Sequence, residues 1–206
     1  INVHHEQAAV MAVGAYFRAS GKYSAAIVTA GAGASNAITG VISNWADSIP
    51  SIIISGQEPS RFINEHKNLR MYGTQGFNIT KMLKDVIKYG VCISDPKSIH
   101  LELAKCYDIS KNNRPGPCWL DIPFDIQAEE VIGVDFPNKV NDKDYKLKVN
   151  LLDLLKSSKR PVILGGNGVR LSNAKREFQA LINTTNIPTL LSWSGIDLLP
   201  DNHPYY

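Results

Sequence analysis

One carboxylate has the type and position expected of an acid–base catalyst: Glu6, at the start of a stretch with helical spacing. A helix is predicted over residues 5–19, because apolar side chains recur there every three or four positions and Gly21 follows. The apolar residues 8–10 are expected to desolvate the carboxyl group and raise its pKa, which would suit proton exchange with a heterocycle near neutral pH. The alternative is that Glu6 only stabilises the N-terminus of its helix.

Two glycine-rich loops could bring the backbone close to a phosphate or a ring. The first, residues 31–36 (GAGASN), follows a predicted strand and opens a helix. It lacks the third glycine of the dinucleotide-binding fingerprint, and the carboxylate considered as the ribose ligand of such a cofactor, Glu58, lies beyond the following strand. The second, residues 165–168 (GGNG), also follows a strand. A plain tight turn is the alternative for the first loop, and a left-handed turn for the second.

Polar side chains at strand ends form a third group of candidates. Gln57 closely follows an apolar run and Gln75 lies in a Gly-Thr-Gln-Gly turn, and parallel α/β sheets bind ligands at the carboxyl ends of their strands. His4 and His5 are not expected to bind a metal, because adjacent residues on a helix diverge and no histidine or cysteine partner is nearby. The signatures of serine hydrolases, P-loop nucleotidases and thioredoxin-like proteins are missing from the sequence.

The elements that would position these residues alternate between strands and helices. Apolar, β-rich runs predict strands at four places: 25–29, 51–55, 87–93 and 118–122. The runs 26–28 and 52–54 are apolar at consecutive residues, as expected of strands covered by helices on both faces. Helical spacing predicts helices over 33–46, 78–86 and 97–110, and residues 1–3 suggest the remains of a further strand. The fold class is therefore α/β, with a parallel sheet flanked by helices.

A second α/β region follows a stretch without periodicity. Residues 128–148 are rich in charged and turn-forming types and are predicted to form a linker. The alternation then resumes, with predicted helices at 151–156 and 173–183 and predicted strands at 161–164 and 188–191. Only two strands fit into this region, which predicts a Rossmann-like domain cut short.

Composition narrows the classes of partner. The chain has 206 residues, 44% of them hydrophobic, and a net charge of +3 without a block of lysine and arginine, so nucleic acid is not an expected partner. No apolar run is long enough to predict a membrane span. The three cysteines, Cys92, Cys106 and Cys118, lack metal-ligand or redox spacing and are predicted to be reduced, buried thiols in a cytoplasmic protein.

Several of these segments together resemble the thiamine diphosphate enzymes of the acetolactate synthase type. The matching segments are HHEQAA (4–9), TAGAGASN (29–36), DSIP (47–50), ISGQ (54–57), RPGP (114–117) and LDIP (120–123). The resemblance implies a pyrimidine-binding domain over 1–127 that lacks its first strand and helix. Residues 149–206 then resemble the start of the family's central domain, so the chain is expected to be a fragment that is inactive alone.

The resemblance also implies roles for individual residues. Glu6 matches the catalytic glutamate that bonds the aminopyrimidine ring of the cofactor and promotes loss of the thiazolium C2 proton. The implied cofactor-binding residues are Glu6, Ala32, Gly33, Asn36 and Gln57. Thr74 and Gln75 match positions on the substrate side.

The implied activity is that of a carboligase or decarboxylase acting on 2-oxo acids such as pyruvate, in a homodimer or homotetramer. Thiamine diphosphate is the implied cofactor, Mg²⁺ would be held by a domain outside this chain, and FAD remains open. Two departures bear on the substrate: the family's Gly-Pro-Gly is Gly-Ala-Gly at 31–33, and Thr74 replaces a common phenylalanine. They leave open another 2-oxo acid or acyl donor. The two glycine loops, together with the lack of the family's diphosphate-binding Gly-Asp-Gly motif, leave open a nucleotide- or flavin-binding module without catalysis.

Overall fold

The computed structural model describes residues 1–65, 68–131 and 150–206. The chain divides into two compact units, Ile1–Asp142 and Lys143–Tyr206. The predicted linker, residues 128–148, lies mostly outside the described residues, so the predicted domain limits stay a prediction.

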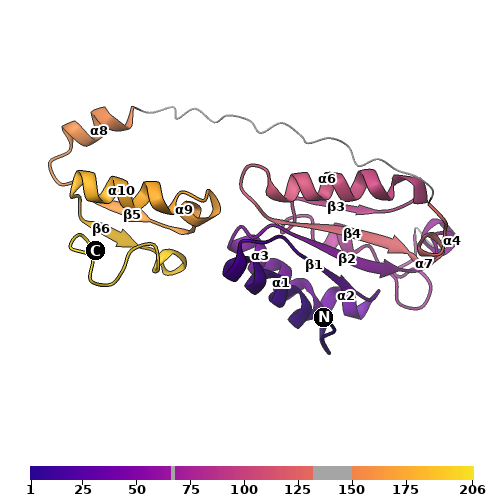
Figure 1. The fold of residues 1–206 in the computed structure, drawn as a ribbon. Helices are drawn as coiled ribbons and strands as arrows, with labels where there is room; N and C mark the ends of the chain where they lie inside the picture. The colour runs from indigo at the N-terminus through magenta and orange to yellow at the C-terminus, as the bar shows by residue number, and fades with distance from the viewer. Residues whose placement is uncertain (66–67, 132–149) are drawn as a thin grey trace. The chain divides into compact units, whose positions relative to one another are not determined.

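A four-stranded, fully parallel sheet forms the centre of the first unit (Figure 1). Its order is β1-β2-β4-β3, so β2 and β4 occupy the middle. The strands are β1 (Ala25–Val28), β2 (Ser51–Gln57), β3 (Tyr89–Cys92) and β4 (Pro117–Pro123). The predicted fold class, a parallel α/β sheet flanked by helices, is confirmed.

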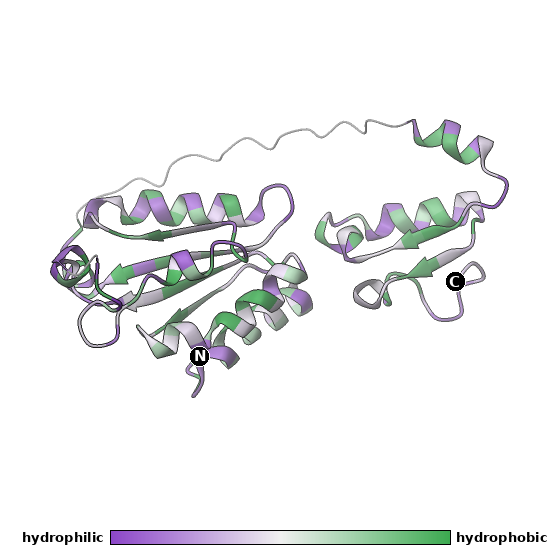
Figure 2. Cartoon of the chain, turned by 180° about the vertical axis from the view of Figure 1, so that it is seen from behind, coloured by the Kyte–Doolittle hydropathy of each residue, from purple (hydrophilic) through white to green (hydrophobic). Residues whose placement is uncertain are grey.

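Helices cover both faces of this sheet. On one face, α1 (Glu6–Ser20) packs against α3 (Ile38–Ala46), and their side chains share a core with Ile53 and Trp119. On the other face, α6 (Ile99–Lys111) contributes Cys106 to a core with alternate residues of β2 and β4. In Figure 2 α6 alternates between apolar and polar segments, as expected of a helix that packs with one face.

Burial on both faces explains why β2 is apolar at consecutive positions. The same prediction was wrong for β1, because alternate residues of that strand are exposed, Ile27 to 79%. Ile52 and Ile53 are both buried although their side chains point to opposite faces of the sheet. The pairing aligns Ile53 with Trp119 and Ser55 with Asp121. Polar residues of β2 and β4 therefore meet near the carboxyl ends of the central strands.

Several predicted boundaries were wrong, each for a local reason. The predicted helix 33–46 is two helices, α2 (Ala32–Asn36) and α3, because the amide of Ala37 bonds the carbonyl of Ala34 in a tighter turn. The predicted helix 78–86 shortens to α5 (Ile79–Met82), and α6 is preceded by the 3₁₀ turn η1 (Pro96–Ser98). Residues 1–3 form no strand. The sequence analysis missed the short helices α4 (Ser60–Glu65) and α7 (Phe124–Gln127).

The second unit has a parallel pair of strands with helices around it. The strands are β5 (Ile163–Gly165) and β6 (Thr189–Leu191). The helical elements are α8 (Leu151–Ser157), α9 (Asn167–Leu171), α10 (Lys175–Thr185) and η2 (Trp193–Gly195). Phe178, Ile182, Leu198 and Leu199 form its buried core.

The glycines at 165–168 do not form the left-handed turn considered as the alternative. None of them has a positive φ, and residues 167–171 form α9. Gly165 has a packing reason instead, because a Cβ there would lie 2.5 Å from Cζ of Phe178. A Cβ on Gly168 would meet nothing within 4 Å.

Candidate functional site

Glu6 lies in the first turn of α1, half-buried and linked to the end of α2. The Asn36 side-chain amide donates a hydrogen bond of 2.9 Å to its carboxylate. This bond, the backbone amide of Glu6 and the nearby His5 hold the pKa of Glu6 below its usual value, against a smaller opposing effect of burial. The predicted rise in the pKa of Glu6 was therefore wrong. The cause is a donor 30 residues away in the sequence, which outweighs desolvation by the adjacent alanines.

The glycine loop that follows β1 lies directly against this carboxylate. A Cβ on Gly33 would stand 2.9 Å from Oε1 of Glu6 and 2.3 Å from Cγ2 of Thr29, so only glycine fits without displacement. Gly31 has a positive φ of 64°, which favours glycine for a second reason. The structure thus brings Glu6, Gly33 and Asn36 together, with Ala32 exposed beside them.

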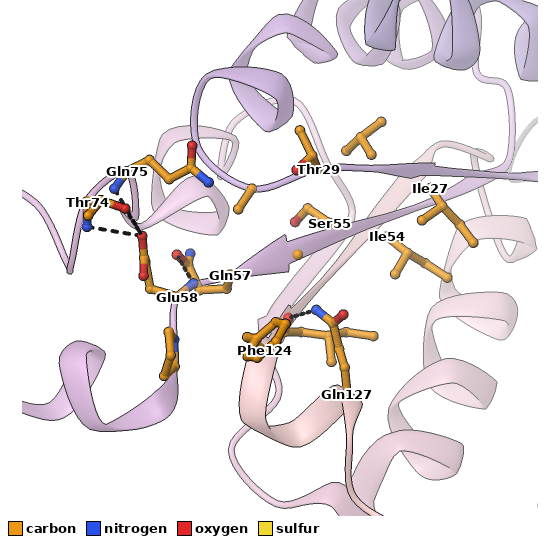
Figure 3. Close-up of a pocket in the computed structure, with 15 residues that line it drawn as sticks. Ile27, Thr29, Ile54, Ser55, Gln57, Glu58, Thr74, Gln75, Phe124 and Gln127 are labelled. Atoms are coloured by element: carbon orange, nitrogen blue, oxygen red, sulfur yellow. Dashed lines mark hydrogen bonds between the residues drawn. The ribbon is translucent and has the colours of Figure 1, made fainter. Parts of the chain in front are cut away.

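A cleft of about 600 Å³ opens at the carboxyl ends of β1, β2 and β4 (Figure 3). Its walls combine apolar side chains of the strands with polar side chains of the loops that follow them. The predicted residues Gln57, Thr74 and Gln75 all line it. The cleft is where a parallel sheet is expected to bind a ligand.

Gln57 is buried and its polar atoms are engaged within the protein. Its amide nitrogen donates to Asp121 (2.7 Å) and to the carbonyl of Phe77 (2.9 Å). Its oxygen accepts from the backbone amide of Glu58 (2.9 Å). In this arrangement Gln57 ties the end of β2 to its neighbours, and its predicted contact with a cofactor stays a prediction.

Asp121 is the centre of this buried polar group and was missed by the sequence analysis. It is 2% exposed and accepts hydrogen bonds from Ser55 (2.6 Å) and Gln57. Ser55 in turn accepts one from the indole of Trp119 (2.7 Å). Burial raises the pKa of Asp121 to about 6, although its hydrogen bonds oppose the shift. No sequence signal distinguished this aspartate from an ordinary residue of the LDIP segment.

The turn that carries Thr74 and Gln75 contacts both parts of the site. Oε1 of Glu58 accepts hydrogen bonds from the backbone amides of both residues. The carbonyl oxygen of Gln75 lies 2.7 Å from the position that a Cβ on Gly31 would take. The turn therefore rests on the same loop that holds Gly33 against Glu6.

Metal ligands do not gather in the described part of this chain. Among residues 1–65, 68–131 and 150–206, no three histidine, cysteine, aspartate or glutamate side chains come close enough to hold an ion. His5 lies against Asn36 rather than against a second possible metal ligand. Its ring nitrogens are 3.3 and 3.4 Å from the side-chain amide nitrogen of Asn36.

Comparison with known proteins places this geometry in a family. Residues 1–84 match the profile of the thiamine pyrophosphate enzyme N-terminal TPP binding domain, and residues 149–206 match the profile of the central domain. The chain belongs to the thiamine pyrophosphate enzymes. Glu6 and the loop around Gly33 both lie inside the N-terminal match.

Relatives of the family extend over nearly the whole chain. A probable acetolactate synthase large subunit of Methanococcus aeolicus is 33% identical over 97% of the chain and 34% of its own length. The corresponding protein of Methanocaldococcus jannaschii is 32% identical over 99% of the chain and 35% of its own length. The acetolactate synthase large subunit of Buchnera aphidicola subsp. Acyrthosiphon pisum is 32% identical over 98% of the chain and 36% of its own length. The chain thus spans about a third of the length of these relatives.

In the part of the chain that the structure describes, no helix is both long and apolar enough to cross a membrane.

Proposed function

We propose that this chain is part of a thiamine diphosphate-dependent enzyme that makes or breaks a carbon–carbon bond next to the carbonyl of a 2-oxo acid such as pyruvate. The observation that carries the proposal is the contact among Glu6, Asn36 and Gly33 in a member of this family. A carboxylate with a fixed donor and a bare backbone beside it suits a flat, nitrogen-containing ring. The similarity to acetolactate synthase large subunits supports the 2-oxo acid.

In the proposed reaction, each of the site residues of this chain has a separate role. Glu6, kept ionised by its lowered pKa, accepts a hydrogen bond from a protonated ring nitrogen. Asn36 holds the carboxylate in place, and Gly33 leaves room for the ring at the backbone. Thr74 and Gln75 lie on the substrate side. Bound thiamine diphosphate would supply the nucleophilic carbon that attacks the 2-oxo group.

Other parts of the proposal concern groups beyond these residues. Mg²⁺ would bind together with the diphosphate in another domain, and the active enzyme would be a homodimer or homotetramer. Whether the enzyme is a transferase or a lyase depends on which molecule accepts the group released from the 2-oxo acid. The free cysteines support a cytoplasmic location. FAD binding at residues 165–168, which end β5 and open α9, stays a prediction.

The test is Glu6→Gln in the protein at its natural length, with the exposed Glu129→Gln as the matched control. Glu6→Gln should slow exchange of the cofactor's C2 proton and turnover of pyruvate by about 100-fold or more, while Glu129→Gln leaves both unchanged. Calorimetry should still detect thiamine diphosphate binding in the presence of Mg²⁺. Near-normal proton exchange in Glu6→Gln would contradict the role of Glu6.

A further inference from the structure

Glu58 holds a single turn through one carboxylate oxygen. Its Oε1 accepts hydrogen bonds from the amide of Thr74 (3.1 Å), the hydroxyl of Thr74 (3.0 Å) and the amide of Gln75 (3.0 Å). Tyr72 and Gly76 close the turn with a reciprocal pair of backbone hydrogen bonds of 2.8 and 2.9 Å. Figure 3 shows the carboxylate beneath the turn at the rim of the cleft.

The turn is shaped around this side chain. Gly73 has a positive φ of 54°, and a Cβ there would lie 2.6 Å from Oε2 of Glu58. A Cβ on Gly76 would lie 2.6 Å from Cγ of Glu58. The two glycines therefore leave the space that Glu58 fills. At position 73 the positive φ favours glycine as well.

Glu58 is itself fixed to the centre of the sheet. Its backbone amide donates to Gln57, and the Gln57 side chain bonds the buried Asp121. The backbone of Glu58 is thus restrained, so the carboxylate reaches the turn from a fixed point of the sheet. Hydrogen bonds to a charged acceptor are stronger than neutral ones, which favours a well-defined turn.

The position of the turn has consequences for the site. Gln75 packs against Gly31, where its carbonyl oxygen and Cβ lie 2.7 and 2.9 Å from the position of a Gly31 Cβ. A shift of the turn would change the wall of the cleft formed by Thr74 and Gln75. It would also change the support of the loop that leads to Gly33.

We propose that Glu58 is a positioning residue that fixes the turn of residues 72–76, and through Thr74 and Gln75 sets how well the enzyme discriminates among its 2-oxo acid substrates. This inference rests on the proposed function for its kinetic part. Its structural part, the restraint of the turn by Glu58, stands independently of any activity.

The test compares three variants of the protein at its natural length. Glu58→Ala removes the acceptor, Thr74→Val removes only the hydroxyl donor, and the exposed Glu129→Ala is the control. Hydrogen–deuterium exchange at the amides of residues 74 and 75 should accelerate about tenfold or more in Glu58→Ala. The ratio of kcat/KM values for pyruvate and 2-oxobutyrate should change about tenfold in Glu58→Ala, mainly through KM, and less in Thr74→Val.

A purely structural role would lower thermal stability without changing that substrate ratio. Glu58→Gln addresses folding, because it keeps the shape and one carbonyl oxygen and should recover part of the amide protection. Unchanged exchange at residues 74 and 75 in Glu58→Ala would overturn the proposal, as would a substrate ratio equal to that of Glu129→Ala. If the wild-type protein has no thiamine diphosphate-dependent activity, the proposed function fails, and the exchange experiment still decides whether Glu58 holds the turn.

Discussion

The side-chain amide of Asn36 lies 2.9 Å from the carboxylate of Glu6, joining the end of α2 to the start of α1. A donor at this distance favours the ionised carboxylate, and it is the largest contribution to the lowered pKa of Glu6. The protonation state of the proposed catalytic residue therefore depends on where the glycine loop places the short helix α2.

Asn36→Ala should move the acid limb of the activity profile to higher pH. Without the amide, the pKa of Glu6 rises, so a larger fraction of the enzyme is protonated and inactive at pH 6 than in the wild type. The measurement is kcat/KM for pyruvate from pH 5 to 9, with the exposed Asn64→Ala as the control. An unshifted acid limb in Asn36→Ala would show that this hydrogen bond does not govern Glu6.

Gly33→Ala should disturb the same carboxylate by crowding. The added methyl group would stand 2.3 Å from Thr29 and 2.9 Å from Glu6, so the loop or the carboxylate must move. We expect a loss of about 1–3 kcal/mol in the free energy of unfolding, together with about tenfold lower turnover. Gly168→Ala is the matched control, since its Cβ meets nothing and alanine in α9 should stabilise by up to about 1 kcal/mol. Equal melting temperatures for the two variants would contradict the expected crowding.

The strands were predictable because burial on both faces leaves a plain trace in the sequence. Ile52 and Ile53 are apolar in succession because helices cover both sides of the sheet at β2. The apolar run 26–28 predicted the strand β1 but not its burial, since Ile27 is 79% exposed. Helix boundaries were less predictable. The break at Ala37 depends on a hydrogen bond to Ala34, and alanine is compatible with either geometry.

The candidate site shows the same division between local and long-range information. The position of Glu6 at the start of a helix follows from spacing, but its pKa depends on Asn36, which periodicity does not connect to it. Glu58 was considered only as a ribose ligand and set aside. The sequence signal for its contact with the turn is the pair Gly73 and Gly76, which flank Thr74 and Gln75. Both glycines leave room for the side chain of Glu58.

The cysteines should resist alkylation while the protein is folded. Cys106 and Cys118 are fully buried, so the reagent cannot reach them. Burial raises the pKa of the Cys92 thiol to about 12, so Cys92 carries little reactive thiolate. Treatment with iodoacetamide at pH 8, followed by peptide mapping by mass spectrometry, should find all three unmodified. The same treatment in guanidinium chloride should modify all three. Rapid native labelling of Cys106 or Cys118 would contradict the packing of α6 on β4.

Asp121 should make the protein less stable as the pH rises from about 4 to 7. Its pKa is about 6 in the folded protein and 3.8 as an ordinary aspartate, so the folded state retains a proton that the unfolded state has lost over this interval. This contribution to the free energy of unfolding is fully present below pH 3.8 and is lost as the pH rises through 6.

Comparison with Asp121→Asn isolates this effect from the other carboxylates, because they titrate in both proteins. Between pH 7.5 and pH 4.5, the wild type should gain about 2 kcal/mol relative to Asp121→Asn, which carries no titrating group at this position. Urea unfolding followed by tryptophan fluorescence measures the difference at each pH, and Asp153→Asn, at an exposed position in α8, serves as the control. A constant difference between wild type and Asp121→Asn would mean that Asp121 is ionised throughout, with Ser55 and Gln57 compensating its burial.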